Sequence, residues 1–296
     1  MKRLSSVLCA VDIGEPGRAA FGSALALARA HAAKMIIVYA VPPTQSFNTG
    51  ASDRLAYLVK LRAAAETAGL EVRIDVQHGD ASKVILLHAR TRQPDLIVLS
   101  ARHGEDPNGH GTSSVVEDVV RRAHCPTLVV RGNQEPSTSR TFSNVLCAVD
   151  FSAASAAAIE RADSLMAGVG ARLMLLHVVP GPEGSSGFRS MRLHAPEYFR
   201  HVTASALQRL RSLIPSRPGG PVLARVTVGS VASGILRAAR ASRADIVVVG
   251  TQSRSGPGRR VFGVLAELLA EAPCPILAVP MPRADLREND RSRPAA

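Results

Sequence analysis

The sequence predicts an α/β protein built from two tandem copies of one domain, each with a five-stranded parallel sheet. Three observations lead to this fold class. Segments of the first half return in the second half, short apolar runs alternate with longer Ala-rich stretches, and the apolar runs are continuous in Val, Ile and Leu. The returning segments are Leu8–Asp12 as Leu146–Asp150, Asp95–Ser100 as Asp245–Gly250, and Cys125–Val130 as Cys274–Val279, at offsets of 138, 150 and 149 residues.

Each observation has a physical reason. A repeat of this length is a duplicated domain and not a solenoid unit. Apolar strands that alternate with helices favour βαβ units and a parallel sheet. Strands without polar alternation are typical of a sheet that helices cover on both faces.

The expected elements follow the same order in both repeats. In repeat 1 we expect strands at 7–11, 35–41, 72–77, 96–99 and 127–131, and helices at about 18–33, 54–68, 82–92 and 114–122. In repeat 2 we expect strands at 145–149, 173–179, 223–228, 246–249 and 276–279, and helices at about 154–167, 196–213, 232–242 and 262–271. The predicted domains are therefore 1–132 and 142–282, with a polar linker at 133–141. The tail at 283–296 has no periodicity, and we expect it to be disordered.

Composition limits the function. No apolar run approaches the roughly 18 residues of a membrane helix, and the apolar stretch 7–11 is too short for a signal peptide, so we expect a cytoplasmic protein without a membrane partner. The net charge is +12, but the arginines are spread along the chain and there is no Trp, with three Tyr and seven Phe. On composition alone we therefore do not expect nucleic-acid binding. The four cysteines form no CxxC pair and sit at two duplicated positions, which indicates buried thiols and not a disulfide framework.

Candidate ligand groups stand just after the strands, because open parallel sheets bind ligands at the carboxyl ends of their strands. Asp12 and Asp150 follow the first strand of each repeat. They fit two roles equally well, a ligand contact or a cap on the next helix. Gly79 and Gly229 follow the third strand, where a tight turn is their first role.

At these positions the chain resembles the universal stress protein family. The segments that carry the likeness in repeat 2 are 147–152, 175–178, Gly229, 244–250 and 272–279, and repeat 1 matches in the same order at 10–12, 79–80, 95–98 and 125–130. The resemblance implies two Rossmann-like domains, of the adenine nucleotide alpha hydrolase-like type, that pair as an intramolecular pseudo-dimer through the strands at 127–131 and 276–279. It also leaves a homodimer as a candidate assembly. Some members bind ATP through Gly-x2-Gly-x9-Gly-(Ser/Thr), and others lack this pattern and do not.

This chain departs from the ATP pattern in both repeats. Repeat 1 has lost all three glycines and keeps only the hydroxyl, whereas repeat 2 keeps two glycines and has Val in place of the hydroxyl. The resemblance also implies that Val178 would contact the base and that Asp150 would lie near base or ribose. The candidate nucleotide residues of repeat 2 are Asp150, Val178, Gly229, Gly250, Ser253, Gly263 and Val264. The degenerate set of repeat 1 is Asp12, Ala40, Gly79, Ser100, His103, Ser113 and Ser114.

Other charged groups near these loops have ordinary explanations. Arg254, Arg259 and Arg260 are candidates for holding an anion in repeat 2, although a solvated basic loop is the more common role. The loop His103–His110 matches no standard metal spacing, so we expect no metal.

These observations favour a non-enzymatic stress-response module, with binding or regulatory function and degenerate nucleotide sites. No standard enzyme motif is present. The alternative is a weak ATP or AMP sensor, or a slow ATPase, that uses repeat 2. No cofactor is certain, and ATP in the second repeat is the one candidate.

Overall fold

The structure is a computed structural model of the whole chain, and it describes residues 4–44, 46, 48–101, 114–131, 142–165, 170–181, 195–214, 221–251 and 259–281. The chain divides into two compact units, Met1–Arg140 and Thr141–Ala296. Each unit is an α/β domain of its own.

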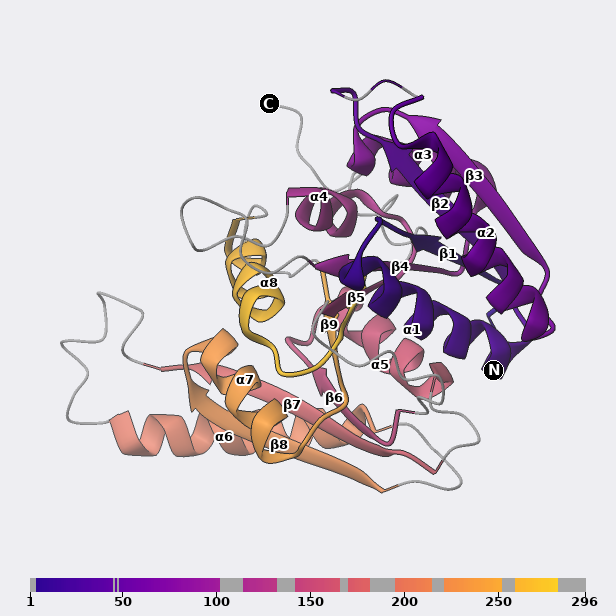
Figure 1. Cartoon of the computed structure of the whole chain (residues 1–296). Coiled ribbons are helices and arrows are strands. Elements are labelled where there is room, and N and C mark those ends of the chain that lie inside the picture. The colour runs from indigo at the N-terminus through magenta and orange to yellow at the C-terminus, as the bar shows by residue number, and fades with distance from the viewer. Residues whose placement is uncertain are drawn as a thin grey trace, which may run out of the picture. The chain divides into compact units, whose positions relative to one another are not determined.

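Unit 1 alternates strands and helices along its whole length (Figure 1). Its strands are β1 (Ser6–Ala10), β2 (Lys34–Val41), β3 (Val72–His78), β4 (Leu96–Ala101) and β5 (Thr127–Arg131). Its helices are α1 (Glu15–His31), α2 (Ala51–Thr67), α3 (Ala81–Arg92) and α4 (Ser114–Arg122).

Unit 2 repeats this order. Its strands are β6 (Asn144–Ala148), β7 (Arg172–Pro180), β8 (Val222–Gly229), β9 (Ile246–Gly250) and β10 (Ile276–Val279). Its helices are α5 (Ala153–Leu165), α6 (Ala195–Ser212), α7 (Val231–Ala241) and α8 (Arg259–Glu271).

Both sheets have the same topology, and all the strand pairs within each unit are parallel. The strands of unit 1 lie in the order β3-β2-β1-β4-β5, and those of unit 2 in the order β10-β9-β6-β7-β8. Strand order reverses between β1 and β4 and between β6 and β9, which is where such sheets form a ligand crevice. In unit 1, right-handed crossovers place α1 and α2 on one face of the sheet and α3 and α4 on the other. In unit 2, α5 and α6 cover one face of the sheet and α7 and α8 the other.

The core explains why the strand predictions hold. The central strands are almost fully buried, as continuous apolar runs require. The same contact joins the amino ends of the two central strands in each sheet. Asp95 accepts main-chain N–H bonds from Ser5 and Ser6 at 2.7 and 3.2 Å. Asp245 accepts them from Ser143 and Asn144 at 2.7 and 3.1 Å. The fold class is therefore confirmed in both units.

The last helices of the two units fix how the repeats correspond. The burial pattern of residues 114–125 returns at 263–274, with buried side chains at 116, 119, 120, 123 and 125 and again at 265, 268, 269, 272 and 274. The offset is therefore 149 throughout this helix, and Ser114 corresponds to Gly263. Spacing from the preceding strand had paired Ser114 with Val264, whose half-buried side chain corresponds instead to that of Val115.

No helix among the described residues is long and apolar enough to cross a membrane. The expectation that the units pair through the strands at 127–131 and 276–279 stays a prediction, and so does homodimer formation.

Candidate functional site

Four candidate residues of each unit lie at the carboxyl edge of its sheet, Asp12, Ala40, Gly79 and Ser100 in unit 1 and Asp150, Val178, Gly229 and Gly250 in unit 2. In unit 2, Val149 N–H donates to Leu176 O at 2.8 Å, and Gly181 N–H donates to Gly229 O at 3.2 Å, so the ends of β6, β7 and β8 are held together. In unit 1 the matching bonds are Val11 N–H to Val38 O at 3.0 Å and Gly79 N–H to Val41 O at 2.9 Å.

Asp150 makes two hydrogen bonds to Ser152, just before the start of α5. Its Oδ1 accepts bonds from the main-chain N–H of Ser152 at 3.0 Å and from the Ser152 hydroxyl at 2.5 Å. The Ser152 Oγ in turn accepts the N–H of Ser155 at 3.1 Å, which caps the helix. Asp150 therefore fixes the turn before α5 through one carboxylate oxygen, whereas the cap of the helix itself is Ser152.

A stack of three side chains lies beside this cap. Phe151 has φ 61°, a left-handed conformation that is costly for an aromatic residue. Its ring centroid lies 4.5 Å from that of His177, and the Arg209 guanidinium carbon lies over the Phe151 ring, 4.3 Å from its centroid. The His177 ring is fixed because its Nδ1–H donates to Val149 O at 2.7 Å. This group combines a cation and aromatic rings at the carboxyl edge of the unit 2 sheet.

The glycines of unit 2 have packing reasons. A Cβ on Gly250 would lie 2.8 Å from the Ala154 carbonyl carbon and 2.9 Å from Ser155 N, so only glycine lets α5 approach β9 this closely. Gly229 has φ 141° and Gly79 has φ 150°, which confirms the turn role expected for both. None of these three glycines therefore needs a ligand to account for it.

Val178 also has a structural partner. A Cβ on Gly234 of α7 would lie 3.1 Å from both Val178 Cγ atoms, so the valine side chain fills the space that the glycine leaves. Val178 is only 6% exposed. In unit 1 the same two positions hold Ala40 and Val84, with the small residue on the strand and the larger one on the helix.

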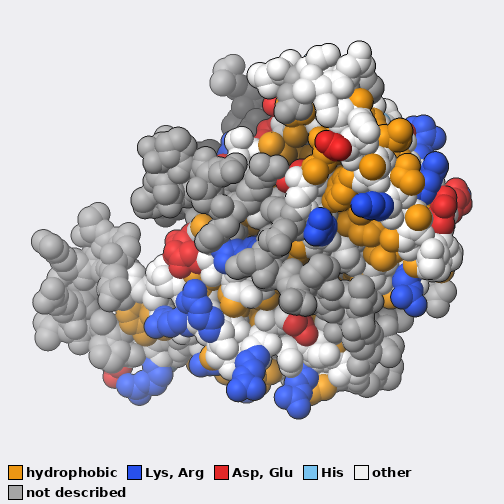
Figure 2. Space-filling model, viewed as in Figure 1, with side chains coloured by type: hydrophobic (Ala, Val, Ile, Leu, Met, Phe, Trp, Pro, Cys, Tyr) orange, Lys and Arg blue, Asp and Glu red, His pale blue; other side chains and the backbone are white. Residues whose placement is uncertain are grey.

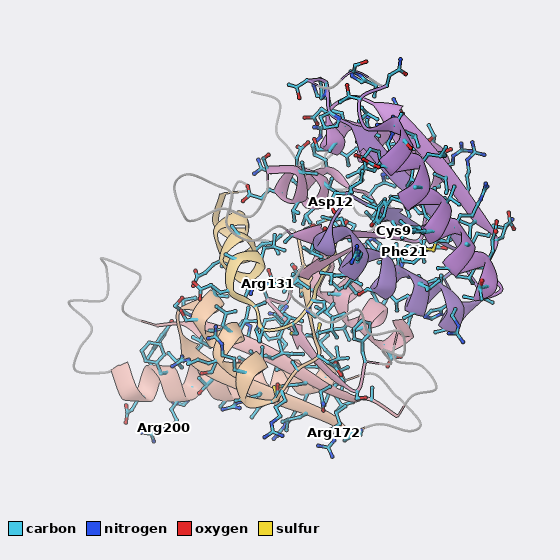
Figure 3. The ribbon with its side chains drawn as sticks, viewed as in Figure 1. Cys9, Asp12, Phe21, Arg131, Arg172 and Arg200 are labelled. Carbon is cyan, nitrogen blue, oxygen red and sulfur yellow. The ribbon has the colours of Figure 1, made fainter. Side chains whose placement is uncertain are left out.

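Unit 1 has a different set of groups at the same edge. Asp12 packs against the first turn of α1, where a Cβ on Gly17 would collide with the Asp12 main-chain oxygen and lie 2.5 Å from Oδ1. The Tyr57 hydroxyl of α2 is buried and makes no hydrogen bond to the described residues. Burial, together with the nearby Cys9 and Asp12, raises the Tyr57 pKa to about 12. Figure 3 shows Asp12 just after β1, which carries Cys9.

A buried arginine adds a cation to unit 1. Arg54 is 5% exposed, its guanidinium carbon lies 5.9 Å from the centre of the Tyr39 ring, and its Nη1 donates to Thr49 O at 3.3 Å. Tyr39 corresponds to His177, so each unit sets an arginine from its second helix against an aromatic group at the same edge. Ala40 is half-buried beside Tyr39, and Ser100 is half-buried at the end of β4.

The phosphate end of each crevice is described only in part. His103, Ser113 and Ser253 lie outside the described residues, and so do Arg254 and the side chains of Arg259 and Arg260. Ser114 is the exposed first residue of α4, whereas Gly263 lies exposed within α8, which begins four residues earlier at Arg259. The structure therefore brings Asp150, Val178, Gly229 and Gly250 to one edge but does not place a complete phosphate loop there.

Sequence reasoning missed several of these groups. It did not single out Arg54, Tyr57, Phe151 or Arg209. A signal was available for Phe151, because it directly follows a candidate Asp, but the helix residues carry no motif. They reach the crevice only through the folding of α2 and α6 onto the sheets.

Neither metal nor thiol chemistry finds support. Among the described residues, no group of three or more His, Cys, Asp and Glu side chains is placed to hold a metal ion. All four cysteines are buried and free, as the sequence predicts. Burial raises the pKa of the Cys9 thiol far above its ordinary value and that of Cys147 to about 12, so neither is a ready nucleophile.

The fold and its crevices define a tandem pair of Rossmann-like domains. The profile of the Universal stress protein family matches residues 4–131 and 141–280. The chain therefore belongs to the universal stress protein family, and it carries two copies of the domain.

Known relatives agree with this assignment. A curated universal stress protein of Thermus aquaticus is 32% identical over 144 residues, which cover 47% of this chain and 98% of that protein. Among solved structures, a universal stress protein from Archaeoglobus fulgidus has a TM-score of 0.71 at 15% identity, covering 94% of this chain and 97% of its own. A protein of unknown function from Pseudomonas aeruginosa has a TM-score of 0.66 at 17% identity, covering 98% of each chain. At these identities the two structures show a shared fold and no more.

Proposed function

We propose that this protein is a non-catalytic binding module of the stress response, in which neither crevice keeps the complete ATP loop of its family. The observation that carries the proposal is the correspondence of Ser114 with Gly263, set by the burial of the two last helices. Unit 1 keeps the hydroxyl but has Ser113 in place of the glycine before it. Unit 2 has Gly263 at the hydroxyl position and Phe262 at the glycine position.

The physical consequence is that both units bind phosphate weakly. Glycine lets the main chain approach an anion closely, and a side chain there blocks it. A missing hydroxyl removes one hydrogen bond to a charged group, worth about 1.5–3 kcal/mol. That loss alone corresponds to roughly ten- to a hundredfold in affinity.

A weak adenine nucleotide site in unit 2 remains the second candidate. It is favoured by the Phe151–His177 ring pair, which lies under the Arg209 guanidinium beside the exposed Asp150. Aromatic and cationic groups of this kind suit a flat base near a phosphate.

The first experiment looks for bound nucleotide. The full chain is purified without added nucleotide and denatured, and the supernatant is analysed by chromatography for AMP, ADP and ATP. The native protein is also titrated with Mg-ATP by calorimetry. We expect no stoichiometric nucleotide and no saturation below about 1 mM, the weak end of ordinary affinities. A nucleotide recovered at one per chain would contradict the proposal.

The second experiment tests the correspondence itself. The variant S253G/F262G/G263S places the family's residue types at the positions that burial assigns, with eight residues instead of nine before the last glycine. The variant S253G/V264S restores the full pattern at the positions that spacing assigns. We expect a gain of ATP binding in the first variant alone. Binding only by the second variant would show that the burial-based alignment is wrong. If neither variant binds ATP while both stay folded by circular dichroism, residues of unit 2 outside the loop also prevent ATP binding.

A further inference from the structure

Five arginines of unit 2 share one face of its sheet, and we call them the arginine face. Arg237 and Arg240 lie on the exposed side of α7, and Arg243 follows the C-cap residue Ser242 of that helix. Arg172 begins β7, and Arg225 lies in the middle of β8. All five side chains are exposed.

Contacts with α7 show that the two strand residues belong to this face. Gly234 of α7 packs against the side chains of Val178 and Thr227. Side chains on a strand alternate between the two faces, so Arg172 lies on the same face as Val178, and Arg225 on the same face as Thr227. The opposite face carries His177, whose ring meets the Phe151 ring beneath Arg209 of α6. Figure 3 shows Arg172 and Arg200 of α6 well apart.

The arginine face has no carboxylate partner among the described residues. Among the described residues, the one polar contact of these five side chains is a bond from Arg240 Nη2 to the main-chain oxygen of Glu271 at 3.4 Å. Arg237 lies against the Gly229 turn. Figure 2, with α7 toward the reader, shows separate Lys or Arg groups over this part of unit 2. Exposed arginines without partners leave a strong positive potential.

In unit 1 the duplicated positions carry less charge, and ion pairs neutralise part of it. The counterparts of Arg172, Arg225, Arg237, Arg240 and Arg243 are Lys34, Asp75, Leu87, Arg90 and Gln93. Lys34 pairs with Glu71 at 2.8 Å, and Asp75 pairs with Arg73 at 2.9 Å and Arg92 at 3.5 Å. These five positions carry a net charge of +1 in unit 1 and +5 in unit 2. When the pairing partners and their neutral counterparts Pro221, Leu223 and Ser242 are included, the net charges are +2 and +5.

Of the 36 basic residues of the chain, 32 are arginine, but this general preference for arginine does not explain the difference between the units. Both units belong to one chain, so both are subject to the same codon usage. Residues 1–140 hold 17 basic and 13 acidic residues, whereas residues 141–280 hold 15 arginines and 8 acidic residues. The excess of charge is thus specific to unit 2 and gathers where ion pairs have been removed.

We infer that the arginine face binds the phosphate backbone of a nucleic acid without reading its sequence. Guanidinium groups bind phosphate oxygens in a two-point geometry and are weakly hydrated. On α7, Arg237 and Arg240 lie about 4.5 Å apart along the helix axis, a span that meets more than one charge of a duplex with one charge per roughly 1.7 Å of axis. No described Trp, Tyr or Phe lies among these five residues to stack on bases, so the contact is with the backbone. Composition alone had favoured the opposite expectation, because it does not locate the charges.

The test measures binding of a fluorescein-labelled DNA duplex of about 20 base pairs by anisotropy, with the full chain, at about 50 to 200 mM salt. The variant R237Q/R240Q/R243Q removes three charges from the face, and R243Q restores the residue of unit 1. The matched control R161Q/R200Q/R211Q removes three charges from α5 and α6, which cover the other face. Circular dichroism checks that each variant is folded.

We expect the face variant to lose at least about tenfold in affinity and the control to change by less than about threefold. The salt slope should fall by about 2.7 in the face variant, since each phosphate contact contributes about 0.9. The slope of the unmodified protein is an independent check and should be about −2.7 or steeper. Equal losses in both variants, or no binding at the lowest salt, would refute the inference. Binding to vesicles with anionic lipid but not to DNA would refute it as well.

Discussion

The pair Val178–Gly234 permits a quantitative test of why a candidate base-contact residue is valine. Both Val178 Cγ atoms lie 3.1 Å from the place where a Cβ on Gly234 would stand. Normal contacts between carbon atoms are about 3.5–4.0 Å, so any side chain at 234 must displace Val178. In unit 1 the sizes of the two residues are exchanged, with the small Ala40 on the strand and the larger Val84 on the helix.

The magnitudes follow from this geometry. G234V should destabilise unit 2 by about 1–3 kcal/mol, as overpacking of a filled core does. V178A removes two buried carbons and should cost about 1.6 kcal/mol, at 0.8 kcal/mol for each, before any cavity cost. The double variant V178A/G234V reproduces the unit 1 pair and should return close to the original stability. The coupling energy of the cycle should therefore be about 2 kcal/mol or more, against about 0.5 kcal/mol or less for independent sites.

The assay is urea unfolding of the full chain followed by circular dichroism. Hydrogen exchange with mass spectrometry assigns the change to unit 2, because two domains need not unfold together. The matched control is A40V/V84G, which should behave in the same way in unit 1. Additive single effects would mean that the two side chains do not share the space, and that valine at 178 needs another explanation, such as a ligand.

Three further predictions follow from individual contacts. S152A should destabilise unit 2 by about 1 kcal/mol, since Ser152 Oγ accepts the Ser155 N–H at the start of α5, and a lowered urea midpoint would show it. All four cysteines should resist a thiol reagent at pH 8 until the protein is unfolded, because they are buried and burial raises the pKa of Cys9 and Cys147; fast reaction of the native protein would contradict this. The pKa values of Asp80 and Asp118 lie below normal, for Asp80 chiefly through the Lys83 N–H and for Asp118 chiefly through the Ser82 hydroxyl. Their stabilisation is present above the unfolded-state pKa of about 3.9 and is lost as the pH falls further, so S82A should raise both pKa values in an NMR titration and weaken this acid dependence.

The strands could be predicted because their signal is local. Each is an apolar run between polar or Gly-containing segments, and the observed bounds differ from the expected ones by one or two residues at most. The sequence predicts the first residue of a helix less closely than the bounds of a strand. The first helix was expected from about residue 18 but begins at Glu15, because Pro16 fits the first turn, where its missing N–H costs nothing. The last helix of unit 2 was expected at about 262 and begins at Arg259.

The site was harder to predict because its partners are distant in sequence. Asp150 and Ser152 form a local turn pattern, in which Asp150 bonds to Ser152 and Ser152 in turn caps α5. By contrast, the glycine that explains Val178 comes from α7, 56 residues later, and no spacing rule connects them. The one-residue deletion before α8 could not be located from spacing either, whereas the burial of successive side chains locates it before Leu265.

The two units have changed in different ways in the core and on the surface. In the core, the exchange of Ala40 and Val84 for Val178 and Gly234 keeps a large residue beside a small one, which is what packing requires at nearly constant volume. On the surface, Arg225 stands where unit 1 has Asp75, and Leu223 and Ser242 stand where unit 1 has its partners Arg73 and Arg92. Exposed ion pairs contribute little to stability, so their loss leaves the fold intact. Because stability does not require five unpaired arginines on one face, a requirement for binding an anionic partner is the better explanation for them.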